Sequence, residues 1–326
     1  MSELLSVENL NVRFRVRDML SSLLKPGTPS HIEAVAGVSF HIDEGETFGL
    51  VGESGSGKTT LGRALIGLAP VNQGSIRFKG QELAGLSDRA YKSHRRNMTM
   101  MFQDPTGCLS PRLRVKSILA QPFHIHGVRL DNKTEKIEEL LSLVGLPPEF
   151  KNRYPHQLSG GQARRIGLAR ALALSPRLII ADEPTAGLDV SIQGDILNLL
   201  GKVQEESNVS VLAITHNLAV IRHISERMAI MYLGRFVEVG TTEEIFARPG
   251  HPYTQALLAA NPIPDPDEAH ARVEIKGDVP SLVNRPKGCE FHSRCPYCKE
   301  KCQSKFPRLR KLAPGHHVMC HYPLNN

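Results

Sequence analysis

The feature that most constrains this chain is a glycine-rich run between an apolar stretch and a helical one. The run Gly52-Glu53-Ser54-Gly55-Ser56-Gly57-Lys58-Thr59 fits the pattern G-x-x-x-x-G-K-[ST]. Glycines let backbone N–H groups turn inward around phosphate oxygens, and a helix that begins near Lys58 adds the positive end of its dipole. Lys58 can reach the terminal phosphates, and the Thr59 hydroxyl can ligate Mg²⁺. The run therefore predicts a nucleotide phosphate site, formed by Gly52, Ser54, Gly55, Gly57, Lys58, Thr59 and Thr60.

Strand and helix patterns alternate along the chain. Stretches of strand length occur at 1–14, 35–42, 47–51, 178–181 and 209–215, and helical patterns occur at 58–68, 133–144 and 162–174. This alternation predicts an α/β fold with a largely parallel sheet. Half of the 22 prolines lie in 249–326, so we expect a main domain at 1–245 and a loop-rich accessory domain at 246–326.

Composition and charge limit where the chain works and what it binds. No stretch approaches the ~18 apolar residues that span a bilayer, and the N-terminus lacks the pattern of a secretory signal, so we expect a cytosolic protein. The whole net charge of +7 lies in 272–326, which holds 11 Lys/Arg and 4 Asp/Glu, whereas the remainder has 29 of each. Such a tail is typical of a solvated segment or a nucleic-acid patch. Five of the six cysteines fall in the same segment, which favours metal or redox chemistry.

Two adjacent acids follow the apolar stretch 178–181. Ligands bind at the carboxyl ends of strands in open α/β sheets, and paired acids there are costly unless a cation joins them. We expect Asp182 to hold Mg²⁺, directly or through water, and Glu183 to orient and deprotonate the attacking water. A strand that ends at two solvated acids is the alternative interpretation.

A second anion site is predicted where Leu158-Ser159-Gly160-Gly161-Gln162 opens a helix, because the serine and the free backbone N–H groups can bind phosphate. Together with the phosphate loop and the acid pair, this motif resembles the signature of ABC-type ATPases. The remaining motifs of that family occur in order. Gln103 matches the Q-loop, Asp189 the D-loop and His216 the switch histidine, and Phe14 stands near the place of the adenine-stacking aromatic, with a core phenylalanine as the alternative.

The resemblance implies a mixed sheet with a helical subdomain and an ATPase that works as a pair. In the family, two subunits hold two nucleotides head to tail, each between the phosphate loop of one subunit and the signature of the other. Catalytic roles are implied for Glu183, His216 and Gln103. Gln103 would contact Mg²⁺ and relay nucleotide state toward membrane subunits, and His216 would hydrogen-bond the terminal phosphate.

The last quarter of the chain resembles one branch of that family. The segments His251–Leu258, Asn261–Pro266, Gly277–Ser281 and Gly288–Pro296 are similar to ATP-binding subunits of dipeptide, oligopeptide and nickel importers. The insertion at 16–33 looks like the F-type subunit. The resemblance implies a bacterial importer, with di- or oligopeptides as the leading solutes. It also implies three kinds of partner: a paralogous D-type ATPase, two membrane permeases and an extracytoplasmic binding protein. We further expect a peripheral location on the cytoplasmic face of the membrane and no binding of nucleic acid.

The same resemblance implies a cofactor in the tail. Family members carry an iron–sulfur cluster there, and the matching cysteines are Cys289, Cys295, Cys302 and Cys320. We therefore expect a [4Fe–4S] cluster, with Zn²⁺ as the alternative. Cys298 departs from the family pattern. Four thiolates around either metal are anionic, which would account for the basic tail.

An ABC ATPase without a transporter, acting on nucleic acid or ribosomes, is the alternative function. Translation factors of this kind carry two cassettes in one chain, and repair proteins insert a long coiled coil before the signature. This chain has one cassette, and about 100 residues without sustained heptads separate its phosphate loop from its signature.

Overall fold

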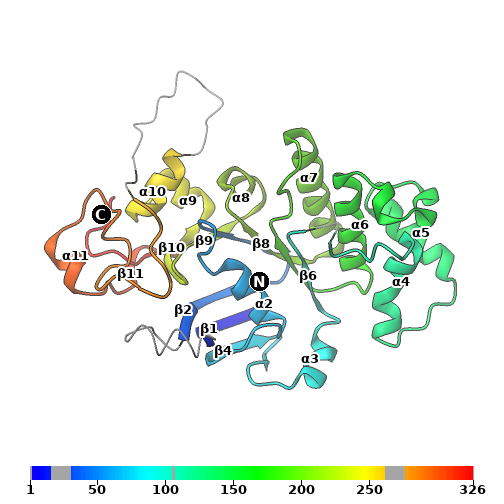
Figure 1. Cartoon of the computed structure of the whole chain (residues 1–326), viewed down its shortest axis with the longest axis horizontal. Coiled ribbons are helices and arrows are strands. Elements are labelled where there is room, and N and C mark those ends of the chain that lie inside the picture. The colour runs from blue at the N-terminus through cyan, green and yellow to red at the C-terminus, as the bar shows by residue number, and fades with distance from the viewer. Residues whose placement is uncertain (1, 16–30, 105–106, 261–274, 276, 326) are drawn as a thin grey trace, which may run out of the picture. The chain divides into compact units, whose positions relative to one another are not determined.

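A computed structural model describes residues 2–15, 31–104, 107–260, 275 and 277–325 (Figure 1). Contacts divide the chain into two compact units. Unit 1 takes its residues from 1–4, 42–47 and 85–214, and unit 2 from 5–41, 48–84 and 215–326. Among the helices of the described ranges, none is both long and apolar enough to cross a membrane.

Unit 1 is built on parallel strands. β7 (Leu178–Asp182) pairs on one side with β6 (Met98–Met101) and on the other with β8 (Ser210–Thr215). All residues of β7 and β8 are buried, which explains why both strands read as apolar runs and not as alternating patterns.

Helices complete unit 1. α4 (Val115–Ile125), α5 (Lys133–Leu143) and α6 (Gly160–Leu172) contact one another, and each turns apolar residues inward. α6 begins at Gly160, two residues before the predicted start, because Ser159 and Gln162 form a capping box. The other helical elements are α3 (Asp88–His94), η1 (Pro148–Asn152), η2 (Pro155–Gln157) and α7 (Val190–Ser207).

Unit 2 contains two groups of strands. The first has the order β2 (His31–Asp43), β1 (Glu3–Arg15), β4 (Gln73–Phe78) and β5 (Gln81–Glu82). The second has the order β11 (Arg310–Ala313), β12 (His316–Val318), β10 (Arg235–Thr241), β9 (Arg227–Tyr232) and β3 (Thr47–Val51). β3 runs parallel to β9, whereas β9, β10, β12 and β11 pair antiparallel, so the sheet is mixed as the resemblance implied.

The helices of unit 2 are α2 (Lys58–Leu65), α8 (Leu218–Ile224), α9 (Thr242–Ala247), α10 (Pro252–Ala259) and α11 (Glu300–Ser304). α2 ends three residues before its predicted limit, because Gly67 takes a positive φ of 69° and its N–H bonds back to Ala64. The tail is less separate than its composition suggested, since β12 pairs with β10.

Two features of the sequence interpretation lie outside the described residues. They are most of the predicted insertion, at 16–30, and the motif Asn261–Pro266. The part of the insertion that is described, from His31 onward, belongs to β2.

Candidate functional site

The predicted phosphate loop connects β3 to α2 in unit 2. Two of its glycines are required by crowding. A Cβ at Gly52 would lie 2.2 Å from the carbonyl oxygen of Met231, and one at Gly57 would lie 2.2 Å from that of Ala34. Gly57 also has a φ of 103°, which L side chains rarely adopt. The loop therefore keeps its path only with glycine at these positions.

Lys58 lies at the first turn of α2, and its side chain turns back into the loop. Its Nζ donates to the carbonyl oxygens of Gly52 at 2.6 Å and Glu53 at 2.9 Å, and the residue is 6% exposed. Around it, Ser54 and Gly55 are exposed, and Thr59 and Thr60 are half-buried. An ammonium, a helix N-terminus and a glycine backbone without side chains form a donor set that fits a triphosphate.

The acid pair lies at the end of β7 in unit 1, where both residues are buried. The backbone of Glu183 has a φ of 51°, and its N–H donates to the carbonyl oxygen of Ile214 at 2.7 Å. Non-glycine residues in this region store strain and cluster at functional sites. Asp182 is 2% exposed, and a buried carboxylate of this kind suits a cation.

Sequence reasoning missed Arg164, which holds the turn after Glu183. Its Nη1 donates to the carbonyl oxygen of Glu183 and its Nη2 to that of Ala186, both at 2.7 Å. Arg164 lies on α6, so the helix that the signature opens is tied to the acid pair. The available signal was a charged residue at an inward position of a buried helix, where arginine is rare unless it is paired.

The signature residues lie at the start of α6. The Ser159 hydroxyl accepts from the N–H of Gln162 at 3.3 Å, and the Gln162 side chain accepts from the N–H of Ser159 at 3.0 Å. Ser159 and Gly160 are exposed, Gln162 is half-buried and Gly161 is buried. The start of this helix is therefore accessible, which an anion site requires.

The other predicted site residues lie near the ends of elements. Gln103 follows β6 by two residues, Asp189 is the N-cap residue of α7, and His216 follows β8, and all three are exposed. Phe14 is the second-last residue of β1 and is 41% exposed, so it is not a core phenylalanine. The structure thus places the phosphate loop, Phe14 and His216 in unit 2, and the acid pair, the signature, Gln103 and Asp189 in unit 1.

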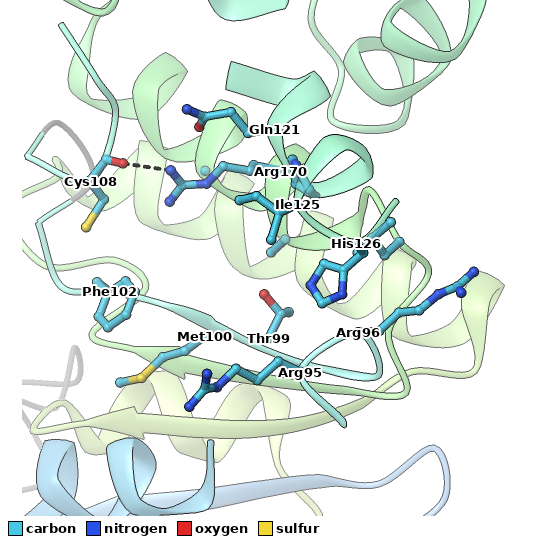
Figure 2. Close-up of a pocket in the computed structure, with 14 residues that line it drawn as sticks. Arg95, Arg96, Thr99, Met100, Phe102, Cys108, Gln121, Ile125, His126 and Arg170 are labelled. Carbon is cyan, nitrogen blue, oxygen red and sulfur yellow. Dashed lines mark hydrogen bonds between the residues drawn. The ribbon is translucent and has the colours of Figure 1, made fainter. Parts of the chain in front are cut away.

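Unit 1 also contains a pocket of about 430 Å³ beside β6 (Figure 2). Phe102 lines it, next to Gln103 in the sequence, but no predicted ATP-site residue does. Its wall is basic. Arg95 and Arg96 approach from one side, and Arg170 from α6 donates to the carbonyl oxygen of Cys108 at 2.6 Å.

The predicted metal centre in the tail is wrong. Across the described ranges, which include all five tail cysteines, no group of three or more His, Cys, Asp or Glu is arranged to hold a metal ion. Burial raises the pKa of the Cys289 thiol to about 12 and that of Cys295 to about 11, and raises the pKa of Cys320 as well. Burial thus disfavours the free thiolate at these three positions. Among the described residues, nothing supports the predicted iron–sulfur cluster or the zinc alternative at Cys289, Cys295, Cys302 and Cys320.

The basic tail has another explanation, because part of its charge pairs with one buried and one half-buried glutamate. Arg285 donates to Glu290 at 2.6 Å, and Arg294 pairs with Glu53 at 2.8 Å. Glu290 is 9% exposed, so its pair is largely removed from water.

Comparisons with known proteins agree with this description. A family model for ABC transporters matches residues 35–186, and one for the C-terminal region of oligopeptide/dipeptide transporters matches 237–302. The oligopeptide transport ATP-binding protein AppF of Bacillus subtilis is 49% identical over 89% of each chain. A putative peptide import ATP-binding protein of Brucella ovis is 44% identical over 97% of each chain.

Solved structures show the same fold. The ATP-binding cassette MJ0796, as a dimer bound to ADP and Pi, has a TM-score of 0.65 at 28% identity and covers 73% of this chain and 99% of its own. CbiO1 from Clostridium perfringens has a TM-score of 0.63 at 27% identity and covers 76% and 92%. The ABC ATPase fold with its mixed sheet is confirmed, and none of these relatives is named as a non-transport ATPase. The chain belongs to the family of ATP-binding proteins of oligopeptide and peptide ABC transporters.

Proposed function

We propose that this chain binds Mg-ATP on the loop Gly52–Thr59 and hydrolyses it with Glu183 as the base, to power import of di- or oligopeptides. ATP hydrolysis is the activity of the family. The nucleotide site is supported most directly by Lys58, whose buried ammonium lies within a loop too tight for a side chain at Gly52. Such an ammonium is poised to exchange loop carbonyls for phosphate oxygens.

Bound Mg-ATP supplies the terminal phosphate that is attacked and the cation that balances its charge. In this proposal Thr59, Asp182 and Gln103 hold the cation, and Lys58 holds the terminal phosphates. Glu183 orients a water and takes its proton. His216 donates a hydrogen bond to the terminal phosphate. The backbone of Glu183 is strained, and Arg164 fixes it through a hydrogen bond. This supports the role of Glu183 as the base, because a general base must be oriented toward the attacking water.

We infer that a second ATPase subunit completes the ATP-binding site. Ser159, Gly160, Gly161 and Gln162 would serve the partner's nucleotide, with Asp189 beside it, and Phe14 would stack on the adenine. The starts of α6 and α7 support this assignment, since Ser159, Gly160, Asp189 and Val190 are exposed there. The proposed partner is the paralogous D-type subunit.

The transport partners follow from the relatives. The names of the AppF and Brucella proteins state oligopeptide transport and peptide import, and the tail matches the model for the C-terminal region of oligopeptide/dipeptide transporters. We therefore infer membrane permeases, an extracytoplasmic peptide-binding protein, and a peripheral position on the cytoplasmic face of the membrane. The predicted boundary between residues 245 and 246 belongs to the same proposal, with the tail as an accessory region.

The substitution Glu183→Gln tests the catalytic assignment in the assembled transporter. It preserves the shape of the side chain but removes the base, so we expect Mg-ATP binding to persist while phosphate release falls at least about 100-fold. Glu205→Gln, at an exposed position of α7, is the matched control and should keep its turnover. A near-normal rate for Glu183→Gln would show that another group acts as the base.

A further inference from the structure

The phosphate loop contains an acidic residue, Glu53, that forms an ion pair with Arg294 of the C-terminal tail. Glu53, the second residue of the loop, accepts two hydrogen bonds from Arg294, from Nη1 at 2.8 Å and from Nη2 at 3.0 Å. The Arg294 side chain is 8% exposed and that of Glu53 27%. Two parallel hydrogen bonds between a guanidinium and a carboxylate fix orientation as well as charge.

A second contact fixes the backbone of the same residue. The N–H of Glu53 donates to the hydroxyl of Tyr253 at 3.0 Å, and Tyr253 is fully buried at the start of α10. Its ring lies 4.8 Å from that of Tyr232 and 5.4 Å from that of Phe291, so the hydroxyl is held by a packed aromatic cluster. Glu53 is thus anchored at its side chain and its main chain by two segments distant in sequence.

The position of Glu53 matters to the site because its own carbonyl oxygen accepts from Lys58 and from the N–H of Ser56. A shift of Glu53 would therefore displace the Lys58 ammonium, which we assign to the terminal phosphates. Such movement would add an ordering cost to nucleotide binding, which a prearranged loop avoids.

The charge of Glu53 matters as well. A carboxylate within a loop that binds polyphosphate repels its ligand, and this repulsion is strong where water is partly excluded. Arg294 offsets that charge at hydrogen-bond distance. Without Arg294, the carboxylate would stay in the loop as an uncompensated negative charge.

The geometry points to Arg294 as a positioning residue of the ATP site: from the C-terminal tail it neutralises Glu53 and holds the phosphate loop in its binding-competent shape. This inference rests on the proposed nucleotide site and adds to it a function for the tail. ATP affinity becomes a property of the tail as well as of the ATPase motifs.

Mg-ATP binding by the full-length protein tests this inference, measured by calorimetry alongside the thermal midpoint of each variant. We expect Arg294→Gln to weaken binding about tenfold or more, because Glu53 is left unpaired beside the phosphates. Arg285→Gln is the matched control, since it breaks another partly buried arginine–glutamate pair of the tail, with Glu290, that does not touch the loop. It should lose stability without losing ATP affinity.

A second substitution separates charge from folding. Adding Glu53→Gln to Arg294→Gln removes the unpaired carboxylate and should restore affinity to within about threefold of the wild type. The inference is overturned if Arg294→Gln binds like the wild type, if Arg285→Gln shows the same loss, or if Glu53→Gln fails to rescue. Lys58→Ala distinguishes the two proposals, because retained binding in that variant would sink the nucleotide site itself.

Discussion

At the scale of single residues, the most specific contact in unit 1 is the fork that Arg164 makes with the turn after β7. Its two terminal nitrogens each donate to a backbone carbonyl at 2.7 Å, one of them belonging to Glu183. Guanidinium geometry lets one side chain satisfy both acceptors at once, which an ammonium cannot reproduce. We infer that Arg164 maintains the strained backbone from which Glu183 acts.

The substitution Arg164→Lys tests this role while keeping the charge. We expect kcat for ATP in the assembled transporter to fall by about 10- to 100-fold with little change in KM, because the base is misaligned while the phosphate loop is untouched. Arg165→Lys is the control, since Arg165 contacts the carbonyl oxygen of Val144 and not the acid turn. An unchanged kcat, or an equal loss in the control, would remove Arg164 from the site.

At the scale of elements, α10 has a titratable N-cap. The Nδ1 of His251 accepts from the N–H of Tyr253 at 3.0 Å, and the backbone N–H of His251 donates to Glu238 at 2.9 Å. Burial lowers the pKa of His251 from about 6.5 to about 4, although the charge of Glu238 opposes this shift. The unfolded chain therefore binds one more proton than the folded chain between these values.

Stability should accordingly depend on pH through this helix cap. The contribution of His251 is complete above pH 6.5 and declines as the pH falls from 6.5 to about 4, by up to about 3 kcal/mol. We expect His251→Asn to flatten this part of the curve, because asparagine does not titrate and is a favoured N-cap. Urea unfolding at several pH values measures the free energy of unfolding of each variant. His124→Asn, at an exposed site on α4, is the control. A slope that survives His251→Asn would assign it to other groups.

Individual helices and strands differ in how well the sequence patterns predicted their bounds. Periodicity and apolar runs located β3, β7, β8 and α5 within one or two residues, because these elements follow local spacing. Local spacing did not indicate the strands of the tail. β12 is only three residues long, and it forms because β10 offers a free edge far away in the sequence.

At the scale of the whole molecule, the sequence predicted the reaction better than it predicted the long-range contacts that position the site residues. The phosphate loop, the signature and the acid pair have fixed local spacing, and the comparisons place the chain in the family that these motifs indicate. Glu53 and Arg294 are 241 residues apart, and no local pattern reports such a pair. The cysteine spacing misled, because it carries no information on whether the side chains converge, and in the described ranges no group of three or more His, Cys, Asp or Glu is arranged to hold a metal ion.

Coupled transport in a reconstituted system measures whether ATP hydrolysis by this chain drives peptide import. Proteoliposomes would contain the permeases, the second ATPase and this chain, with labelled peptide and its binding protein on one side and Mg-ATP on the other. Phosphate release and peptide uptake are then measured together, beside the isolated chain in dilute solution. We predict weak ATPase activity for the isolated chain, an increase of at least about tenfold on assembly, and loss of uptake with Lys58→Ala. Full activity of the dilute monomer, or uptake that persists with Lys58→Ala, would contradict the account.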